Sequence, residues 1–144
     1  MGECVTVKGD VYSYGIVLLE MLTHKKPTHN MFVEGMNLQK WVRSSFPNCI
    51  EEVVDRSLLS NSTIAERDKK LNCLSQLVSM GLLCTKESPE RRPTMIDIVS
   101  QLQRVKDTFL EATGVPKFQS NITNLLGSTS TTHDNHESQS SSTS

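Results

Sequence analysis

One segment near the start of the sequence constrains the fold most, because its apolar residues leave no side for solvent. Between Asp10 and Thr23, apolar residues fill almost every position: Val11, Tyr12, Tyr14, Ile16, Val17, Leu18, Leu19, Met21 and Leu22. In an α-helix these side chains would point in nearly every direction around the axis. A helix that is apolar all round is stable only when other elements surround it. We therefore expect this segment to be the central helix of a larger helical body.

The ends of this central helix are predicted from its flanking residues. Asp10 is expected to open the helix, because its carboxylate can accept hydrogen bonds from the free N–H groups of the first turn. Lys25, Lys26 and Pro27 are expected to end it, since the residue before a proline avoids the helical region and lysines suit the negative end of a helix. The apolar stretch is shorter than the roughly 20 residues that a bilayer requires, and it contains Glu20. We predict no direct membrane insertion.

A short amphipathic helix is predicted after a loop over residues 28–36. Asn37 is expected to begin this helix, and its apolar residues recur on one face: Leu38, Trp41, Val42 and Phe46. Pro47 ends the pattern. We interpret Trp41 as an anchor in the core rather than a platform for a ligand. The segment from Ile50 to Leu59 fits no single element, and its acidic residues are interpreted as the solvated start of a helix.

A long helix is predicted behind the pair Thr63 and Glu66, which have the spacing of a capping box. Apolar and small residues then follow a helical period to about Cys84: Leu71, Leu74, Leu77, Val78, Gly81 and Leu82. A turn is expected between Pro89 and Pro93.

The last helix is predicted behind a second capping pair, Thr94 and Asp97. Its apolar residues form one stripe that continues to about Ala112: Met95, Ile98, Val99, Leu102, Val105 and Phe109. Gly114 and Pro116 are expected to stop the helix.

Composition divides the chain into a folded body and a polar tail. The 144 residues are 36% hydrophobic and 22% charged, an ordinary globular mixture, but residues 128–144 contain no aliphatic or aromatic side chain. Such a segment cannot bury enough apolar surface to offset the entropy of ordering. We predict an ordered body over residues 1–113 and a disordered tail, rich in serine and threonine, over residues 114–144. A net charge of −1 gives no electrostatic reason to expect nucleic acid as a partner.

Two segments carry a resemblance to a known family. In Gly9–Thr23, an aspartate is followed by aromatic, serine, aromatic and glycine and then by the apolar helix; in Gly81–Met95, a turn with two prolines precedes the last helix. The first resembles the central helix of the large lobe of a protein kinase, and the second resembles the turn before the last helix of that lobe. Together with the residue patterns at 25–28 and 31–35, these segments make the chain resemble the C-terminal part of the large lobe of a plant leucine-rich-repeat receptor-like serine/threonine kinase.

The resemblance implies a mainly α fold: the helical C-terminal portion of the kinase large lobe, truncated before the catalytic loop. Residues 1–113 would be a partial kinase domain, from the central helix of the lobe to its last helix. Asp10 matches the family aspartate whose side chain holds the backbone of the catalytic loop. Arg92 matches the arginine that pairs with a buried glutamate at the end of the activation segment. Both would support the kinase lobe without taking part in the reaction.

The sequence departs from the family in its catalytic motifs. No H-R-D, D-F-G, A-P-E or G-x-G-x-x-G motif occurs in it. Phosphoryl transfer needs the residues of these motifs to hold ATP, Mg²⁺ and the attacking hydroxyl. We therefore predict no catalytic, cofactor-binding or metal-binding residue in this chain, while ATP and Mg²⁺ would serve the parent kinase. The four cysteines show no zinc spacing, so no metal site is expected.

Two functions remain open. The chain is either a fragment of an ATP-dependent serine/threonine kinase of receptor signalling, inactive alone, or a separate helical interaction module that binds an intact kinase or another protein. The expected partner is the remainder of the kinase domain or another protein. The parent receptor would place these residues on the cytoplasmic side of the plasma membrane, whereas this chain alone would be soluble and cytosolic. Without its neighbours we expect Arg92 to be unpaired and an apolar patch to be exposed on the central helix.

Overall fold

The computed structural model describes residues 2–114, and this part of the chain is helical with no β-strand. Its four α-helices are α1 (Gly2–Thr23), α2 (Leu38–Ser45), α3 (Ile64–Cys84) and α4 (Met95–Thr113). Three short 3₁₀ helices connect them: η1 (Ile50–Glu52), η2 (Arg56–Leu59) and η3 (Pro89–Arg91). The predicted mainly α fold is confirmed. Apart from Gly114, the predicted tail lies outside the described residues.

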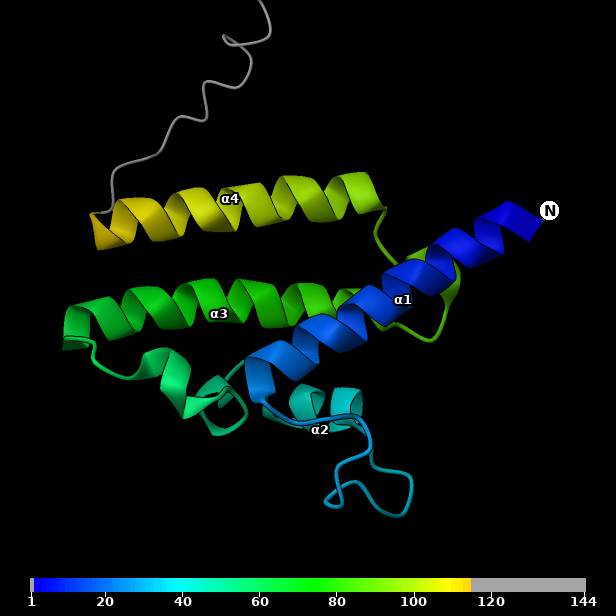
Figure 1. Ribbon diagram of the computed structural model, residues 1–144, viewed down its shortest axis with the longest axis horizontal. Helices are drawn as coiled ribbons and strands as arrows, with labels where there is room; N and C mark the ends of the chain where they lie inside the picture. The colour runs from blue at the N-terminus through cyan, green and yellow to red at the C-terminus, as the bar shows by residue number, and fades with distance from the viewer. Residues whose placement is uncertain (1, 115–144) are drawn as a thin grey trace, which may run out of the picture.

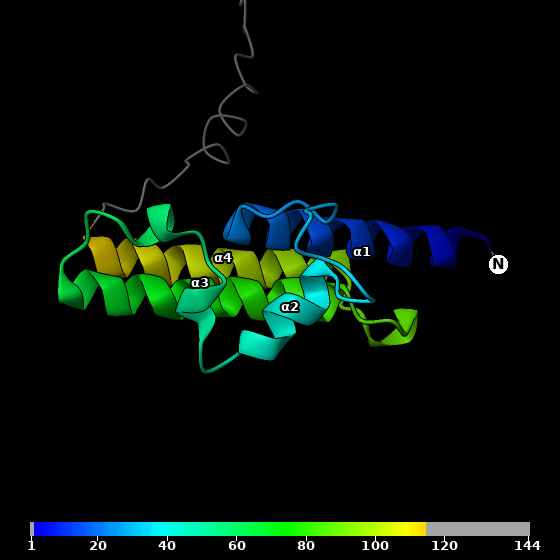
Figure 2. The same cartoon turned by 90° about the horizontal axis from the view of Figure 1, so that it is seen from below.

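Helix α3 occupies the middle of the molecule. Helices α3 and α4 lie side by side and run in opposite directions, and α1 crosses α3 obliquely (Figures 1 and 2). The short helix α2 lies near the C-terminal half of α1, whereas the first turns of α1 extend beyond the other helices. In the described part of the chain, no helix is both long enough and apolar enough to cross a membrane.

Two glycines let α1 and α3 approach closely at their crossing. A Cβ atom added to Gly15 would lie 2.6 Å from the Cβ of Cys84 and 2.8 Å from the Cγ2 of Thr85. A Cβ atom added to Gly81 would lie 2.7 Å from the Cδ2 of Leu19. Real Cβ atoms do not sit at such distances, so the crossing requires both positions to lack a side chain.

The core forms where the helices meet around this crossing. Its largest fully buried side chains come from all four α-helices: Leu19, Leu38, Met80, Ile98, Val11, Val42, Val78 and Cys84. Trp41 of α2 packs against this core, and its ring centroid lies 6.0 Å from that of Phe32. The interpretation of Trp41 as a core anchor is therefore confirmed.

The start of the central helix differs from the prediction. Helix α1 begins at Gly2, so Asp10 lies inside the helix, with its side chain exposed, and caps nothing. Nothing in residues 3–8 forces a break, because the segment contains neither proline nor glycine. Gly9 weakens a helix by only about 1 kcal/mol relative to alanine and does not end it. The C-terminal end was predicted well: the helix stops at Thr23, and His24 has a φ of 53°.

The other predicted helix starts are confirmed. The backbone N–H of Lys40 donates to the Asn37 side chain at 2.9 Å, which begins α2. Helices α3 and α4 both begin with complete capping boxes, at Thr63 and Thr94. The segment that fitted no single element forms η1 and η2. It is tied to α1 by a hydrogen bond from the N–H of Asp55 to the carbonyl oxygen of Leu22, at 2.8 Å.

The capping carboxylates make stability depend on acidity. The Thr63 N–H and then its hydroxyl lower the pKa of Glu66 below its ordinary 4.5, and the Thr94 hydroxyl and then its N–H lower the pKa of Asp97 below 3.8. A carboxyl whose pKa is lower in the folded state contributes stability above its unfolded pKa, and that contribution is lost as the pH falls through the folded pKa. Stability should therefore fall as the pH drops below about 4.5.

We expect Asp97→Asn to reduce the loss of stability at low pH, because the amide that replaces the carboxyl group does not titrate. Chemical denaturation at a series of pH values measures the effect, and Asp107→Asn, on the same helix but away from the cap, is the matched control. If the free energy of unfolding falls equally steeply below pH 4.5 in the parent chain and in the Asp97→Asn variant, the Asp97 cap does not cause the pH dependence.

Candidate functional site

The two residues singled out from the sequence lie in different surroundings. Asp10 lies on the exposed side of α1, and its carboxylate makes no hydrogen bond or ion pair with any other described residue. Arg92 directly follows η3 and is half-buried between the end of α3 and α1. Asp10 and Arg92 do not contact each other. Their roles as supports of a catalytic loop and of an activation segment stay predictions.

The Arg92 guanidinium is held by backbone carbonyl groups. Its Nε donates to the carbonyl oxygen of Lys86 at 2.8 Å, and its Nη2 donates to that of Glu87 at 3.1 Å. Its Nη1 donates to the carbonyl oxygen of Lys8 at 2.9 Å. The guanidinium carbon also lies 4.9 Å from the centre of the Tyr12 ring, within range of a cation–π contact.

No ion pair between Arg92 and a carboxylate is found among the described residues, but its guanidinium donates hydrogen bonds to three carbonyl groups instead. The carbonyl groups just after a helix have no partner within that helix, so those of Lys86 and Glu87 are available as acceptors at the end of α3. Lys8 strengthens the same contact from the other side, because its Nζ donates to the carbonyl oxygen of Arg92 at 2.7 Å and to that of Pro93 at 3.4 Å. These reciprocal bonds fasten α1 to η3. Sequence reasoning missed Lys8, since a single lysine within a helix carries no pattern that reveals its partner.

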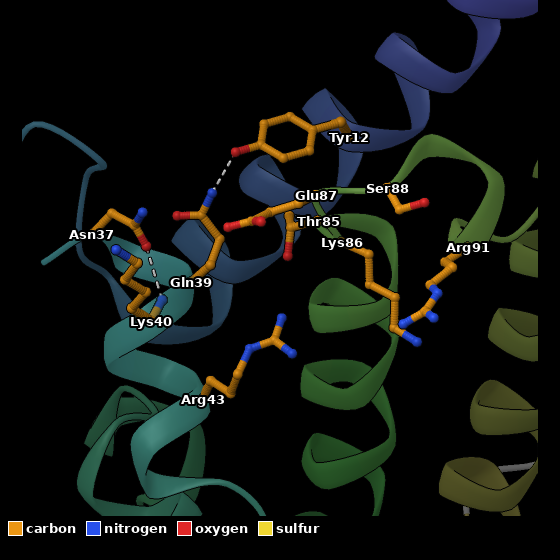
Figure 3. Close-up of a pocket in the computed structure, with 10 residues that line it drawn as sticks. All are labelled: Tyr12, Asn37, Gln39, Lys40, Arg43, Thr85, Lys86, Glu87, Ser88 and Arg91. Carbon is orange, nitrogen blue, oxygen red and sulfur yellow. Dashed lines mark hydrogen bonds between the residues drawn. The ribbon is translucent and has the colours of Figure 1, made fainter. Parts of the chain in front are cut away.

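Beside Arg92 lies an open cavity of about 520 Å³ between α2 and the corner that joins α3 to η3. Ten residues line it: Tyr12, Asn37, Gln39, Lys40, Arg43, Thr85, Lys86, Glu87, Ser88 and Arg91. Figure 3 shows the Arg43 side chain extending from α2 toward the space, with Lys86 and Arg91 on the opposite side. Gln39 closes one end, because its Nε2 donates to the Tyr12 hydroxyl oxygen at 2.6 Å.

The charges of this cavity favour an anionic group. Four of its lining residues are cationic and Glu87 is the one acid among them. This arrangement could not be predicted from the sequence, since the cations come from two separate segments that meet only in the fold. The cavity offers attraction and hydrogen bonds, but its lining includes no cysteine or histidine that could act as a nucleophile or general base.

The buried thiols and acids elsewhere show no reactive arrangement either. Burial raises the pKa of Cys84 to about 11 and also raises the pKa of Cys73, so both thiols are protonated at neutral pH. Within residues 2–114, no three residues of the histidine, cysteine, aspartate and glutamate types are grouped to hold a metal ion.

The apolar face that we expected on the central helix is present. The side chains of Val7, Val17 and Met21 are 51%, 53% and 71% exposed, and their spacing places them on one side of α1. An apolar surface of this kind marks a place where another element packs.

A helical body built around an apolar central helix, with an arginine fastening the turn before the last helix, is the C-terminal portion of a protein-kinase large lobe. Residues 1–102 match the family model for protein tyrosine and serine/threonine kinases, and the chain belongs to this family.

Its relatives include three proteins of Arabidopsis thaliana. The chain is 35% identical over 112 residues to the probable inactive receptor kinase RLK902, and 42% identical over 102 residues to the LRR receptor-like serine/threonine-protein kinase RGI1. It is 38% identical over 104 residues to the leucine-rich repeat receptor-like protein kinase TDR. These alignments cover 76%, 71% and 71% of this chain. The resemblance to plant leucine-rich-repeat receptor-like kinases is therefore confirmed.

The relatives are much longer than this sequence. The aligned residues make up 17%, 8% and 10% of the three proteins, in the same order.

Proposed function

We propose that this chain is a structural support, the helical part of the large lobe, of a receptor-like serine/threonine kinase, and that it transfers no phosphate by itself. The observation that carries the proposal is a contrast within one sequence: residues 1–102 match the kinase family, yet none of the H-R-D, D-F-G, A-P-E and G-x-G-x-x-G motifs occurs. The parent protein would use ATP and Mg²⁺ to phosphorylate proteins in receptor signalling, on the cytoplasmic side of the plasma membrane.

The physical basis is the charge that phosphoryl transfer develops. The transferred group needs magnesium ions, a lysine and a glycine-rich loop around the phosphates, and an aspartate that orients the attacking hydroxyl. The described residues instead supply a packed helical support. Val17 and Met21 of α1 expose an apolar face that the remainder of a kinase domain would cover, and this remainder is the proposed partner.

The test is a phosphotransfer assay on the purified 144-residue chain with Mg²⁺, labelled ATP and a general protein substrate. We expect no transfer above that of a mock purification, because the motifs that place ATP, Mg²⁺ and the attacking hydroxyl for transfer do not occur in the sequence. The intact kinase domain of an active receptor kinase is the positive control. Magnesium-dependent turnover that stays with the chain through several purification steps would overturn the proposal.

A second candidate function is favoured by the same exposed face. A separate interaction module would use Val17 and Met21 to bind an intact kinase or another protein. Adding the purified chain to an intact receptor kinase domain distinguishes the two, since a module forms a complex with an already complete domain. A scaffold whose partner surface is already occupied in that domain does not.

A further inference from the structure

The open cavity between α2 and the corner that joins α3 to η3 carries more positive charge than the fold uses. Among its four cationic side chains, that of Lys40 is bonded within the fold, because its Nζ donates to the carbonyl oxygen of Gly35 at 2.8 Å. The side chains of Arg43, Lys86 and Arg91 make no hydrogen bond or ion pair with any other described residue. Three cationic groups at this cavity therefore have donors that the fold leaves available.

These three groups approach the cavity from two walls. Figure 3 shows the Arg43 guanidinium extending from α2, and the ends of Lys86 and Arg91 on the opposite side. Like charges repel each other, so an anion held between the walls would relieve that repulsion. A guanidinium presents a planar fork of N–H donors that suits the oxygens of a phosphate group. Hydrogen bonds between charged partners are also about twice as strong as neutral ones.

Another part of the same cavity offers an acceptor instead of donors. Figure 3 shows the Glu87 carboxylate toward the Gln39 end of the cavity. The Gln39 Nε2 donates to the Tyr12 hydroxyl oxygen, whereas the Glu87 carboxylate makes no hydrogen bond or ion pair with any other described residue. A complementary ligand has an anionic group at one end and N–H donors at the other. A phosphorylated serine or threonine within a peptide has both, in its phosphate and in the backbone amides beside it.

The lining of the cavity favours a peptide over a membrane surface. Its volume of about 520 Å³ lies within the roughly 300–1,000 Å³ of ligand pockets in proteins. The described residues that line it include no leucine, isoleucine, valine or methionine, and Tyr12 is the one aromatic residue among them. Helices that bind a lipid surface combine cations with apolar side chains that enter the bilayer. The second part of that combination does not line this cavity.

We propose that this cavity binds a phosphorylated serine or threonine residue of another protein. The phosphate lies between Arg43 on one wall and the pair Lys86 and Arg91 on the other. The Glu87 carboxylate accepts a hydrogen bond from a backbone N–H of the bound peptide. A phosphate ester carries a charge of about −1.5 to −2 at neutral pH, so it suits several cations better than a carboxylate with a single charge. The proposal does not depend on whether the chain transfers phosphate, because binding of this kind needs no catalytic motif.

The test measures binding of a short peptide to the purified 144-residue chain by fluorescence anisotropy. The labelled peptide carries one phosphoserine among uncharged residues. Two comparison peptides carry serine or glutamate at the same position. We expect the phosphorylated peptide to bind about tenfold or more tightly than either comparison peptide. Unlabelled inorganic phosphate should displace it only at a much higher concentration, because free phosphate has no backbone amide for the Glu87 end of the cavity.

Substitutions on the two walls locate the binding site. Arg43→Gln and Lys86→Gln should each weaken binding of the phosphorylated peptide about tenfold. Arg104→Gln is the matched control, because Arg104 is exposed on α4, does not line the cavity and loses the same charge. This control should bind as the parent chain does. Arg43 is also exposed and its side chain is not bonded within the described fold, so its substitution should leave the fold intact, as circular dichroism can verify.

Four outcomes would overturn the proposal. The first is equal binding of the phosphorylated and unphosphorylated peptides. The second is an equal loss of affinity in Arg43→Gln and Arg104→Gln, which would mean a general attraction between charges. The third is displacement by inorganic phosphate at the same concentration as by the unlabelled phosphopeptide, which would mean a site for free phosphate. The fourth is Arg43-dependent binding to vesicles that contain a phosphoinositide, without binding of the phosphopeptide, which would mean a lipid site.

Discussion

Replacing Gly15 with valine is expected to remove about 3 kcal/mol or more of the free energy of unfolding, a large fraction of the total for a domain of this size. The reason is the position of its nearest neighbours. A Cβ at residue 15 would lie 2.6 Å from the Cβ of Cys84, and it would also lie 3.0 Å from the carbonyl oxygen of Gly81. These atoms belong to the α3 backbone or are attached directly to it. They can move away only if the two helices separate.

Urea denaturation followed by circular dichroism measures this loss. Gly9→Ala is the matched control on the same helix, because a Cβ at position 9 meets nothing within 4 Å. That control is expected to stabilise the protein by about 0.8 kcal/mol through helix propensity alone. Gly81→Ala should fall between the two, since its new Cβ meets the Leu19 side chain, part of which can rotate. A Gly15→Val variant as stable as the parent chain would show that α1 and α3 do not cross at these glycines.

Replacing Arg92 with methionine is expected to cost about 2 to 3 kcal/mol of stability. Methionine keeps much of the length of the side chain, but it removes the three donors that bind the carbonyl oxygens of Lys86, Glu87 and Lys8. The bonds to Lys86 and Lys8 are partly buried, so those two acceptors would be left without these partners, whereas the bond to Glu87 is exposed. The contact between α1 and η3 would loosen, and the cation–π contact with Tyr12 would be lost.

Arg92→Lys separates the effect of charge from that of geometry. An ammonium group keeps the charge, but it cannot reach three carbonyl groups that a planar guanidinium spans, so we expect it to recover less than half of the loss. Arg91→Met is the matched control, since that neighbouring side chain is exposed. Denaturant unfolding of the three variants measures the differences. Equal losses at positions 91 and 92 would mean that the carbonyl contacts of Arg92 contribute nothing specific.

Features that depend on a few neighbouring residues were predictable from the sequence. The capping pairs Thr63 with Glu66 and Thr94 with Asp97 fixed the starts of α3 and α4, because a capping box is complete within four positions. The buried central helix was equally clear, since a segment that is apolar all round has few alternatives. The start of α1 was not predictable from Asp10. An aspartate caps a helix only if the residues before it are not helical, and here the residues before Asp10 are part of α1.

Features that depend on meetings between distant segments could not be predicted. Arg92 matched a family arginine, but its carbonyl partners depend on where α3 ends relative to α1. The crossing at Gly15 and Gly81 was hidden for a similar reason, since a glycine in a helix does not reveal what it approaches. The cations around the cavity likewise come from segments whose closeness is a property of the fold.

The reciprocal bonds between Lys8 and Arg92 join positions 84 residues apart in the chain. Most of the described residues lie inside the loop that these bonds close, although α4 lies outside it, and the entropy lost on closing a loop grows with its length. The hairpin of α3 and α4 brings together residues that are much closer along the chain. On the route from a newly made polypeptide to the native state, this hairpin is therefore the natural nucleus, and the docking of α1 against η3 is the slow, topologically demanding step.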